Sequence, residues 1–352
     1  IILVRCFTLR PIPYRLAALS LLVLFLVPYA GVLAAWQFRA GPLPVHEVAQ
    51  WAADPSIPKP LVTMAALTRR LPTPQRLRNG VISLFHSNDG GTGVFMLGEV
   101  FPQGHPLYFL VTLALKIPIP LQFTILTGAG LAFYQLLRRL RPPTDLFWLL
   151  PPLLYVALAS LSSLQLGFRL ILPARAFMVL FTGCALEWFR RRRFPLAIPA
   201  LLILWLSVRV VHQYPHYIAY FNSWAGGSDN AAAWLTDSNL DWGQDLPAFA
   251  EWVHTNKPPK IRLAYFGTDN PYAYLSEQVL ETLAPPWNPD LVKGQTRLHP
   301  QPGYYAISAT LLTGQLFSTP YRDYFAEFRH IEPIAKAGYS IFIYRIGDPV
   351  RP

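Results

Sequence analysis

The sequence predicts a polytopic α-helical membrane protein with a small α/β domain at its C-terminal end. Of its 352 residues, 53% are hydrophobic and 14% are charged, whereas ordinary soluble domains have roughly 25% charged residues. The apolar residues form long uncharged runs within residues 1–212, and the rest of the chain has the mixed composition of a globular domain. We therefore expect a membrane domain over residues 1–212 and an extracytoplasmic domain over residues 213–352.

The apolar runs define the predicted membrane spans. A helix that crosses a bilayer needs about 20 mostly apolar residues. The runs of suitable length are Leu16–Phe38, Leu121–Leu137, Leu146–Leu161, Leu170–Trp188 and Pro195–Val211. The sequence predicts one membrane-spanning helix in each of these five runs.

Clusters of arginine at the ends of the runs predict their orientation. The clusters are Arg5, Arg10 and Arg15; Arg138, Arg139 and Arg141; and Arg190–Arg193. Positive charge is enriched in cytoplasmic loops, and alternating spans place all three clusters on that side. We therefore expect a multi-pass protein of the cytoplasmic (inner) membrane. The loop over residues 39–120 and everything after residue 211 would then lie outside the cytoplasm.

The charge balance and the cysteines exclude two classes of function. The net charge is +11, but the basic residues lie at the ends of apolar runs and form no basic face with interleaved aromatics, so nucleic-acid binding is not expected. The two cysteines, Cys6 and Cys184, lie outside residues 213–352. The C-terminal domain therefore has no disulfide, and without a Cys/His cluster no metal is expected.

The predicted external loop contains three helical segments. Leu61–Leu71 and Pro74–His86 have apolar residues at helical spacing with arginines on the other face, a pattern typical of helices on a membrane surface. A solvated face explains the arginines equally well. The apolar segment His105–Ile117 is too short to span. It is predicted either as a re-entrant or interfacial helix or as a partly buried loop helix.

The C-terminal domain alternates predicted strands and helices. The predicted strands are Lys260–Phe266, Tyr304–Ser308 and Tyr339–Ile346, and the predicted helices are Gln244–His254 and Tyr321–Phe328. This order predicts a small α/β layer structure.

The segment Asp237–Asp245 has the highest density of polar groups in the chain. It contains three carboxylates, two amides and an indole within nine residues, and such groups are costly to bury unless they are paired. One interpretation is a pocket that binds the hydroxyl groups of a sugar, with Trp242 as a stacking surface. The other is a local cap at the start of the following helix.

Four stretches resemble a known family. They are Phe95–Glu99 with Tyr108–Phe109 and Leu115–Pro120; Leu166–Pro173; Tyr214–Leu246; and Gly303–Leu312 with Gly338–Ile346. In these stretches the chain resembles the C-terminal part of bacterial C-type (GT-C) membrane glycosyltransferases, the dolichyl-phosphate-mannose-protein mannosyltransferase-like group. The third stretch, which contains Asp-Ser-Asn-Leu-Asp-Trp-Gly-Gln-Asp, is the longest and most specific.

The resemblance implies an enzyme that moves a sugar from a polyprenyl-phosphate carrier to an acceptor on the outer face of the membrane. The lipid-linked sugar would be the donor substrate, with no separate cofactor. Partners would be membrane lipids, the carrier and further membrane chains. The implied roles are Glu99 as the catalytic carboxylate; Arg169 and Lys116 on the lipid phosphate; and Asp237, Asn239, Asp241, Trp242, Gln244, Asp245 and His105 on the sugar or acceptor. Arg175 departs from the family's pattern and is either a further ligand of the lipid phosphate or a mark of divergence. For Arg169 and Lys116, ordinary snorkelling at the end of a helix is an equally good explanation.

One departure from the family opens an alternative function. The family carries its catalytic acid in the first external loop, and the only acidic residues after Leu16–Phe38 in a comparable place are Glu47 and Asp54 in a Pro-rich segment. We therefore expect the catalytic acidic loop upstream of Ile1. The alternative is a non-catalytic membrane scaffold subunit derived from the same fold. A transporter is disfavoured because the sequence shows no internal repeat.

Overall fold

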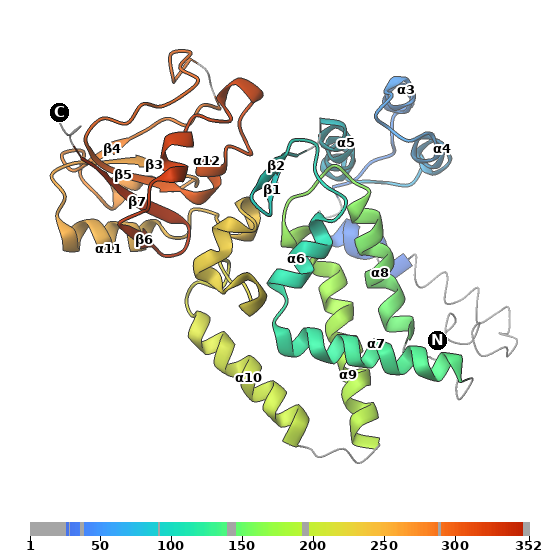
Figure 1. Ribbon diagram of the computed structural model, residues 1–352. Coiled ribbons are helices and arrows are strands. Elements are labelled where there is room, and N and C mark those ends of the chain that lie inside the picture. Colours follow the sequence, from blue (N-terminus) through green and yellow to red (C-terminus); the bar gives the residue numbers. More distant parts are fainter. Residues whose placement is uncertain are drawn as a thin grey trace, which may run out of the picture. The chain divides into compact units, whose positions relative to one another are not determined.

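The chain forms two compact units. The computed structural model describes residues 26–27, 29–35, 39–90, 92–138, 146–191, 197–287 and 290–347. The first unit comprises residues 1–91 and 132–147, and the second comprises residues 92–131 and 148–352. Figure 1 gives the order of the elements along the chain. Most of the first predicted span lies outside the described residues, as do Cys6 and the arginines at Arg5, Arg10, Arg15, Arg139, Arg141, Arg192 and Arg193.

The described part of the first unit includes α3 (Val45–Ala53), α4 (Lys59–Thr68) and α5 (Gln75–Gly90). Two of them confirm the helices predicted in the loop. The Arg78 guanidinium donates hydrogen bonds to the carbonyl oxygens of Thr73 (2.7 Å) and Gly41 (3.3 Å) and pairs with Glu47 at 3.4 Å. This arginine therefore holds the loop before α3 against the start of α5 and is not a free surface cation.

Five further helices follow in the described residues. They are α6 (Tyr108–Lys116), α7 (Ile119–Leu137), α8 (Leu146–Ser160), α9 (Leu172–Arg191) and α10 (Ala197–Gln213). They occupy the apolar runs of the sequence, so the helical character of these runs is confirmed.

The predicted polytopic membrane fold is wrong. Among the described residues, no single helix is both long enough and apolar enough to cross a bilayer. Only a bent pair, Tyr108–Lys116 with Ile119–Tyr134, reaches that length and composition together, and its two parts meet at 116°. This finding overturns the predicted transmembrane helices at Leu121–Leu137, Leu146–Leu161, Leu170–Trp188 and Pro195–Val211.

For α8 and α10, the reason for the error is helix length. α8 has 15 residues and α10 has 17, and at a rise of about 1.5 Å per residue they extend roughly 22 and 26 Å. The apolar core of a bilayer is about 30 Å thick. These two helices have nearly the same bounds as the predicted runs Leu146–Leu161 and Pro195–Val211, so the runs were already shorter than a span requires. Pro118 lies in the break that separates α6 from α7.

The second unit ends in a mixed five-stranded sheet with the order β4-β3-β5-β7-β6. The strands are β3 (Ile261–Ala264), β4 (Leu280–Thr282), β5 (Gly303–Ser308), β6 (Ala335–Ala337) and β7 (Ile341–Ile346). β3 is parallel to β4 and β5, and β7 is antiparallel to β5 and β6. The three predicted strands are therefore present, and β4 and β6 are two short strands that the sequence did not reveal.

The two faces of the sheet are covered by different elements. Side chains alternate along a strand, so Ile261 and Leu263 pack on one face with Leu246 and Phe249 of α11 (Leu246–Asn256). The other face packs against α12 (Ala309–Thr313) and the segment that follows it. Figure 1 shows α11 and α12 beside the strands.

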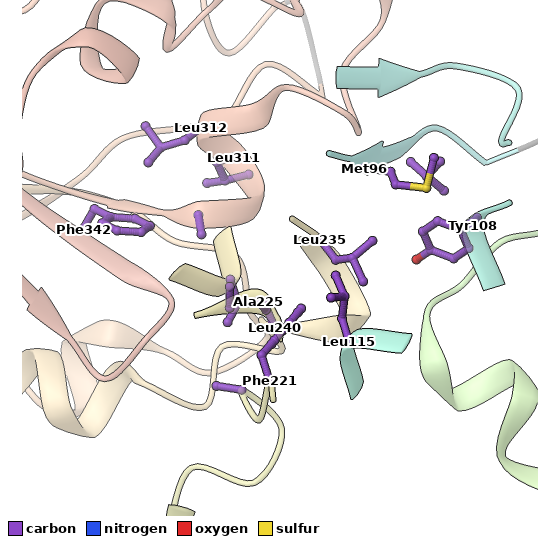
Figure 2. Packing of buried hydrophobic residues seen from close by; sticks show 14 of the residues in the cluster. Met96, Tyr108, Leu115, Phe221, Ala225, Leu235, Leu240, Leu311, Leu312 and Phe342 are labelled. Carbon is purple, nitrogen blue, oxygen red and sulfur yellow. The ribbon is translucent and has the colours of Figure 1, made fainter. Parts of the chain in front are cut away.

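The second face belongs to a core that extends to the helical part of the same unit. Figure 2 shows its buried side chains, which come from β1, α6, the segment after α10, α12 and β7: Met96, Tyr108, Leu115, Phe221, Ala225, Leu235, Leu240, Leu311, Leu312 and Phe342. Because α6 and the sheet share one apolar core, the polar segment between them has a fixed position.

One predicted helix is replaced by short turns. Residues 321–328 form the 3-10 turns η6 (Thr319–Tyr321) and η7 (Ala326–His330) instead of a continuous helix. The Arg322 carbonyl accepts a hydrogen bond from the Arg329 guanidinium at 2.8 Å. That side-chain bond takes a carbonyl that a continuous helix would use for its backbone ladder.

A hairpin that the sequence did not predict precedes α6. β1 (Val94–Met96) and β2 (Glu99–Phe101) are antiparallel and are joined by Leu97 and Gly98. Both turn residues have positive φ, 56° and 89°, which is the geometry of the two-residue turn that matches strand twist. The turn places Glu99 at the exposed start of β2.

We expect Gly314→Ala to lower the free energy of unfolding by about 2 kcal/mol. Gly314 ends α12 with φ of 69°, and an added Cβ would lie 2.0 Å from the Arg322 carbonyl oxygen. Chemical denaturation measures the loss, with Gly80→Ala as the control because a Cβ there meets no atom within 4 Å. An unchanged denaturation midpoint would contradict this account of the turn.

Candidate functional site

Four cationic side chains line one pocket of about 360 Å³ in the second unit. They are Lys116 at the end of α6, Arg169 in η1 (Phe168–Ile171), Arg175 in α9 and Arg209 in α10. The remaining wall is largely apolar and aromatic and includes Pro118, Phe168, Leu172, Leu206, Val210, Tyr217 and Trp242. We call this the cationic pocket.

Lys116 is held by backbone carbonyls. Its Nζ donates hydrogen bonds to the carbonyl oxygens of Ile218 (2.8 Å) and Asn239 (2.5 Å), and it lies 4.5 Å from the centre of the Phe221 ring. Burial, together with the positive charge of Arg175, lowers the pKa of Lys116 to about 7. The ammonium is therefore poised to change its charge near neutral pH.

Aromatic rings position the arginines on the same side. The Arg169 guanidinium lies 4.5 Å from the centre of the Trp242 ring, and its Nε donates a hydrogen bond to the Leu166 carbonyl at 3.1 Å. Arg175 lies 5.5 Å from the centre of the Phe168 ring. Such stacking fixes the plane of a guanidinium and leaves its outer N–H groups available to a ligand.

The pocket has an excess of positive charge. In the part of the chain that the structure describes, no carboxylate forms an ion pair with any of the four cations. Like charges in a shared pocket repel one another, and a bound anion would relieve that repulsion. The apolar wall beside them suits an anion that carries a hydrocarbon group.

Asn239 ties the pocket to the rest of the fold. Its fully buried side chain accepts a hydrogen bond from the Phe168 N–H at 2.9 Å and donates one to the Tyr108 hydroxyl at 2.8 Å. Its carbonyl is also the acceptor for Lys116. Asn239 therefore supports the pocket from behind, through α6 and η1, and does not line it.

The close packing at Gly167 fixes η1 on the same segment. Gly167 has φ of 76°, and an added Cβ would lie 2.8 Å from the Ser238 Cβ. The segment Asp237–Asp245 and the Gly167 turn are therefore packed against each other, which brings Arg169 to Trp242.

The three carboxylates of this segment have different environments. Asp237 is half-buried; burial raises its pKa, and the nearby Arg169 charge opposes that shift. Asp241 is fully buried, and burial raises its pKa to about 7. Asp245 is fully buried and accepts hydrogen bonds from the Tyr339 N–H and from the N–H and hydroxyl of Ser340.

Asp245 therefore joins the segment to the sheet. It is also the residue before α11, but its side chain makes no capping hydrogen bond there, because its oxygens bond the turn between β6 and β7. Gln244 bonds the Leu240 carbonyl at 3.0 Å and accepts from the Trp242 N–H at 2.7 Å. Of the residues predicted in this segment, only Trp242 lines the cationic pocket.

Two predicted residues lie elsewhere. Glu99 lines a second cavity that shares no residue with the cationic pocket. The backbone N–H of His105 donates a hydrogen bond to the Gln165 side chain at 2.9 Å, and its ring stacks on Phe101 at 4.7 Å. The structure thus brings Lys116, Arg169, Arg175 and Trp242 together and separates Glu99 and His105 from them. Their roles stay predictions.

The sequence reasoning missed Arg209 and Tyr220. Arg209 lies within the apolar run Pro195–Val211, and an isolated charge in such a run was the signal that could have identified it. Burial raises the pKa of the Tyr220 hydroxyl, whereas Arg209 and Arg175 both lower it. That effect places the two guanidinium groups beside this hydroxyl.

Within the described residues, no group of three or more His, Cys, Asp or Glu side chains is arranged to hold a metal ion. Comparison with known proteins adds no identity: no family model, no curated protein and no solved structure matches the chain. The cationic pocket and the resemblance in the sequence are therefore the two indications of function.

Proposed function

We propose that the chain is a glycosyltransferase that holds the phosphate of a polyprenyl-phosphate-linked sugar in the cationic pocket. The observation that carries this proposal is the set of four cations without carboxylate partners, beside an apolar wall. The phosphate of such a donor is a diester with one negative charge, and the polyprenyl phosphate released by transfer is a monoester with up to two negative charges near neutral pH and three acceptor oxygens. Guanidinium groups bind such oxygens with paired hydrogen bonds.

The lining of the pocket also suits the lipid end and the sugar end of such a donor. Leu206 and Val210 of α10 offer the first isoprene units an apolar surface. Trp242 and Ser238 also line the pocket, and they offer a ring face and a hydroxyl to the sugar. Neither Asp237 nor Glu99 lines this pocket, so the carboxylate that would accept a proton from the acceptor hydroxyl is not part of its wall.

We expect Arg209→Gln to weaken binding of geranyl phosphate about tenfold, because one charge-assisted hydrogen bond to phosphate is lost. Isothermal titration of the full chain measures this, with geraniol and inorganic phosphate as probes of the two halves of the ligand. Both should bind more weakly than geranyl phosphate. Arg76→Gln is the matched control, because Arg76 is an exposed arginine of α5 in the other unit.

Equal affinity of the wild-type chain and Arg209→Gln for geranyl phosphate would overturn the phosphate assignment. Equal binding of inorganic phosphate and geranyl phosphate would show an anion site with no preference for a hydrocarbon group.

A non-catalytic scaffold subunit is the second candidate. It is favoured by the separation of Glu99 from the cationic pocket and by the complete burial of Asp241 and Asp245. The two candidates differ in turnover. An enzyme releases free polyprenyl phosphate when incubated with a polyprenyl-phosphate-linked sugar and an acceptor, whereas a scaffold binds geranyl phosphate and releases none.

A further inference from the structure

A second cavity of about 700 Å³ lies between the β1–β2 hairpin and the end of the sheet domain. Its apolar wall comes from β1, α12, η7 and β7 and includes Phe95, Ala309, Leu312, Phe328, Phe342 and Tyr344. Figure 2 shows Leu312 and Phe342 of this wall within the core. The charged residues that line it are Glu99, Arg322, Asp323 and Arg329.

Two of these charges satisfy each other. Arg329 pairs with Asp323 at 2.9 Å, and its remaining N–H groups donate to the carbonyl oxygens of Leu312, Thr313 and Arg322. Both side chains already have partners within the protein, so this pair offers little to a ligand.

The other two charges are unpaired. The Arg322 side chain donates no hydrogen bond to any described residue, and its buried Nε has no partner. The Glu99 carboxylate, on the exposed start of β2, has neither an ion pair nor a hydrogen bond within the described parts of the chain. Arg322 lines the cavity without an acidic partner among the described residues, so a bound anion would compensate its positive charge there.

We propose that this cavity binds a free α-amino acid with a large apolar side chain. The carboxylate of the ligand meets Arg322, its ammonium meets Glu99, and its side chain packs on Phe328 and Phe342. One cation and one anion that are not paired with each other complement a zwitterion better than a simple acid or a simple amine. The aromatic wall selects an apolar side chain.

The site is independent of the proposed sugar transfer, because the two pockets share no lining residue. It therefore gives the chain a second ligand class, and it assigns Glu99 to that ligand.

Titration with phenylalanine, N-acetylphenylalanine and phenylalaninamide tests each contact separately. N-acetylation removes the ammonium and amidation removes the carboxylate. We expect each change to weaken binding to the wild-type chain about tenfold. In Arg322→Gln, phenylalanine and its amide should bind equally; in Glu99→Gln, phenylalanine and its N-acetyl derivative should bind equally.

Controls separate folding and the first pocket from this result. Arg297→Gln changes an exposed arginine near Asp323 that does not line the cavity, and it should leave all three affinities unchanged. Arg209→Gln should also bind phenylalanine normally, whatever it does to geranyl phosphate. If Arg322→Gln fails to fold, Glu99→Gln retains the test, because Glu99 is exposed and makes no side-chain hydrogen bond.

Two outcomes would overturn the proposal. One is the absence of saturable phenylalanine binding up to about 10 mM, an affinity too weak for a built site. The other is an identical ranking of the three probes in the wild type and both variants.

Discussion

Replacing Asp245 with alanine should lower the free energy of unfolding by about 3–5 kcal/mol, because it removes a fully buried carboxylate and leaves its donors unpaired. The donors are the N–H groups of Tyr339 and Ser340, the Ser340 hydroxyl and, at 3.1 Å, the Nδ1 atom of His216. Asp245→Asn keeps the shape and one acceptor oxygen, so its free energy of unfolding should fall by less.

The packing around Asp245 explains why the fold does not adapt to this change. Gly338 approaches so closely that an added Cβ would lie 2.2 Å from the Asp245 Cγ. The carboxylate therefore fills a space that the turn between β6 and β7 closes, and alanine would leave both a cavity and open donors.

Denaturation by urea measures the effect, with Asp269→Ala as the control because Asp269 is exposed. A loss below about 1 kcal/mol, the usual range for a surface substitution, would show that Asp245 is not the link between the segment and the sheet.

The sequence predicted the sheet domain better than the membrane domain. Residues 304–308 and 339–346 are β-branched and aromatic runs between glycines, and local composition of that kind largely determines a strand. β4 has three residues and depends on its pairing with β3, so it had no local signal. Two of the predicted spans failed because the runs Leu146–Leu161 and Pro195–Val211 were accepted although a bilayer needs about 20 apolar residues.

The residues of the cationic pocket could likewise be predicted only in part from the sequence. Lys116, Arg169 and Arg175 were selected in the sequence, but Arg209 completes the pocket only because α10 and α9 place their arginines on one cavity. The density of polar groups at Asp237–Asp245 had two interpretations. The sequence could not separate Asp245, which bonds a turn 94 residues away, from Trp242, which lines the pocket.

Binding of a phosphate ester to the cationic pocket should weaken on the order of tenfold between about pH 7 and about pH 8.5, since Lys116 loses its proton in this range. Its pKa is about 7 in the free protein, and a bound anion favours the ammonium. Binding therefore takes up a proton above that pH. The phosphate itself is already mostly dianionic there, because its second pKa is about 6.

Two variants isolate this lysine. Lys116→Met should bind geranyl phosphate more weakly at every pH, and its affinity should not depend on pH. Lys116→Arg keeps its charge throughout and should retain binding at about pH 8.5.

The pH dependence of stability has the opposite sign to the pH dependence of phosphate binding. The lysine of the unfolded chain stays protonated up to about pH 10.4, so the unfolded state holds more protons above pH 7 and this group makes the free protein more stable as the pH rises. A pH dependence of phosphate binding that persists in Lys116→Met would assign the proton to another group and remove Lys116 from the phosphate site.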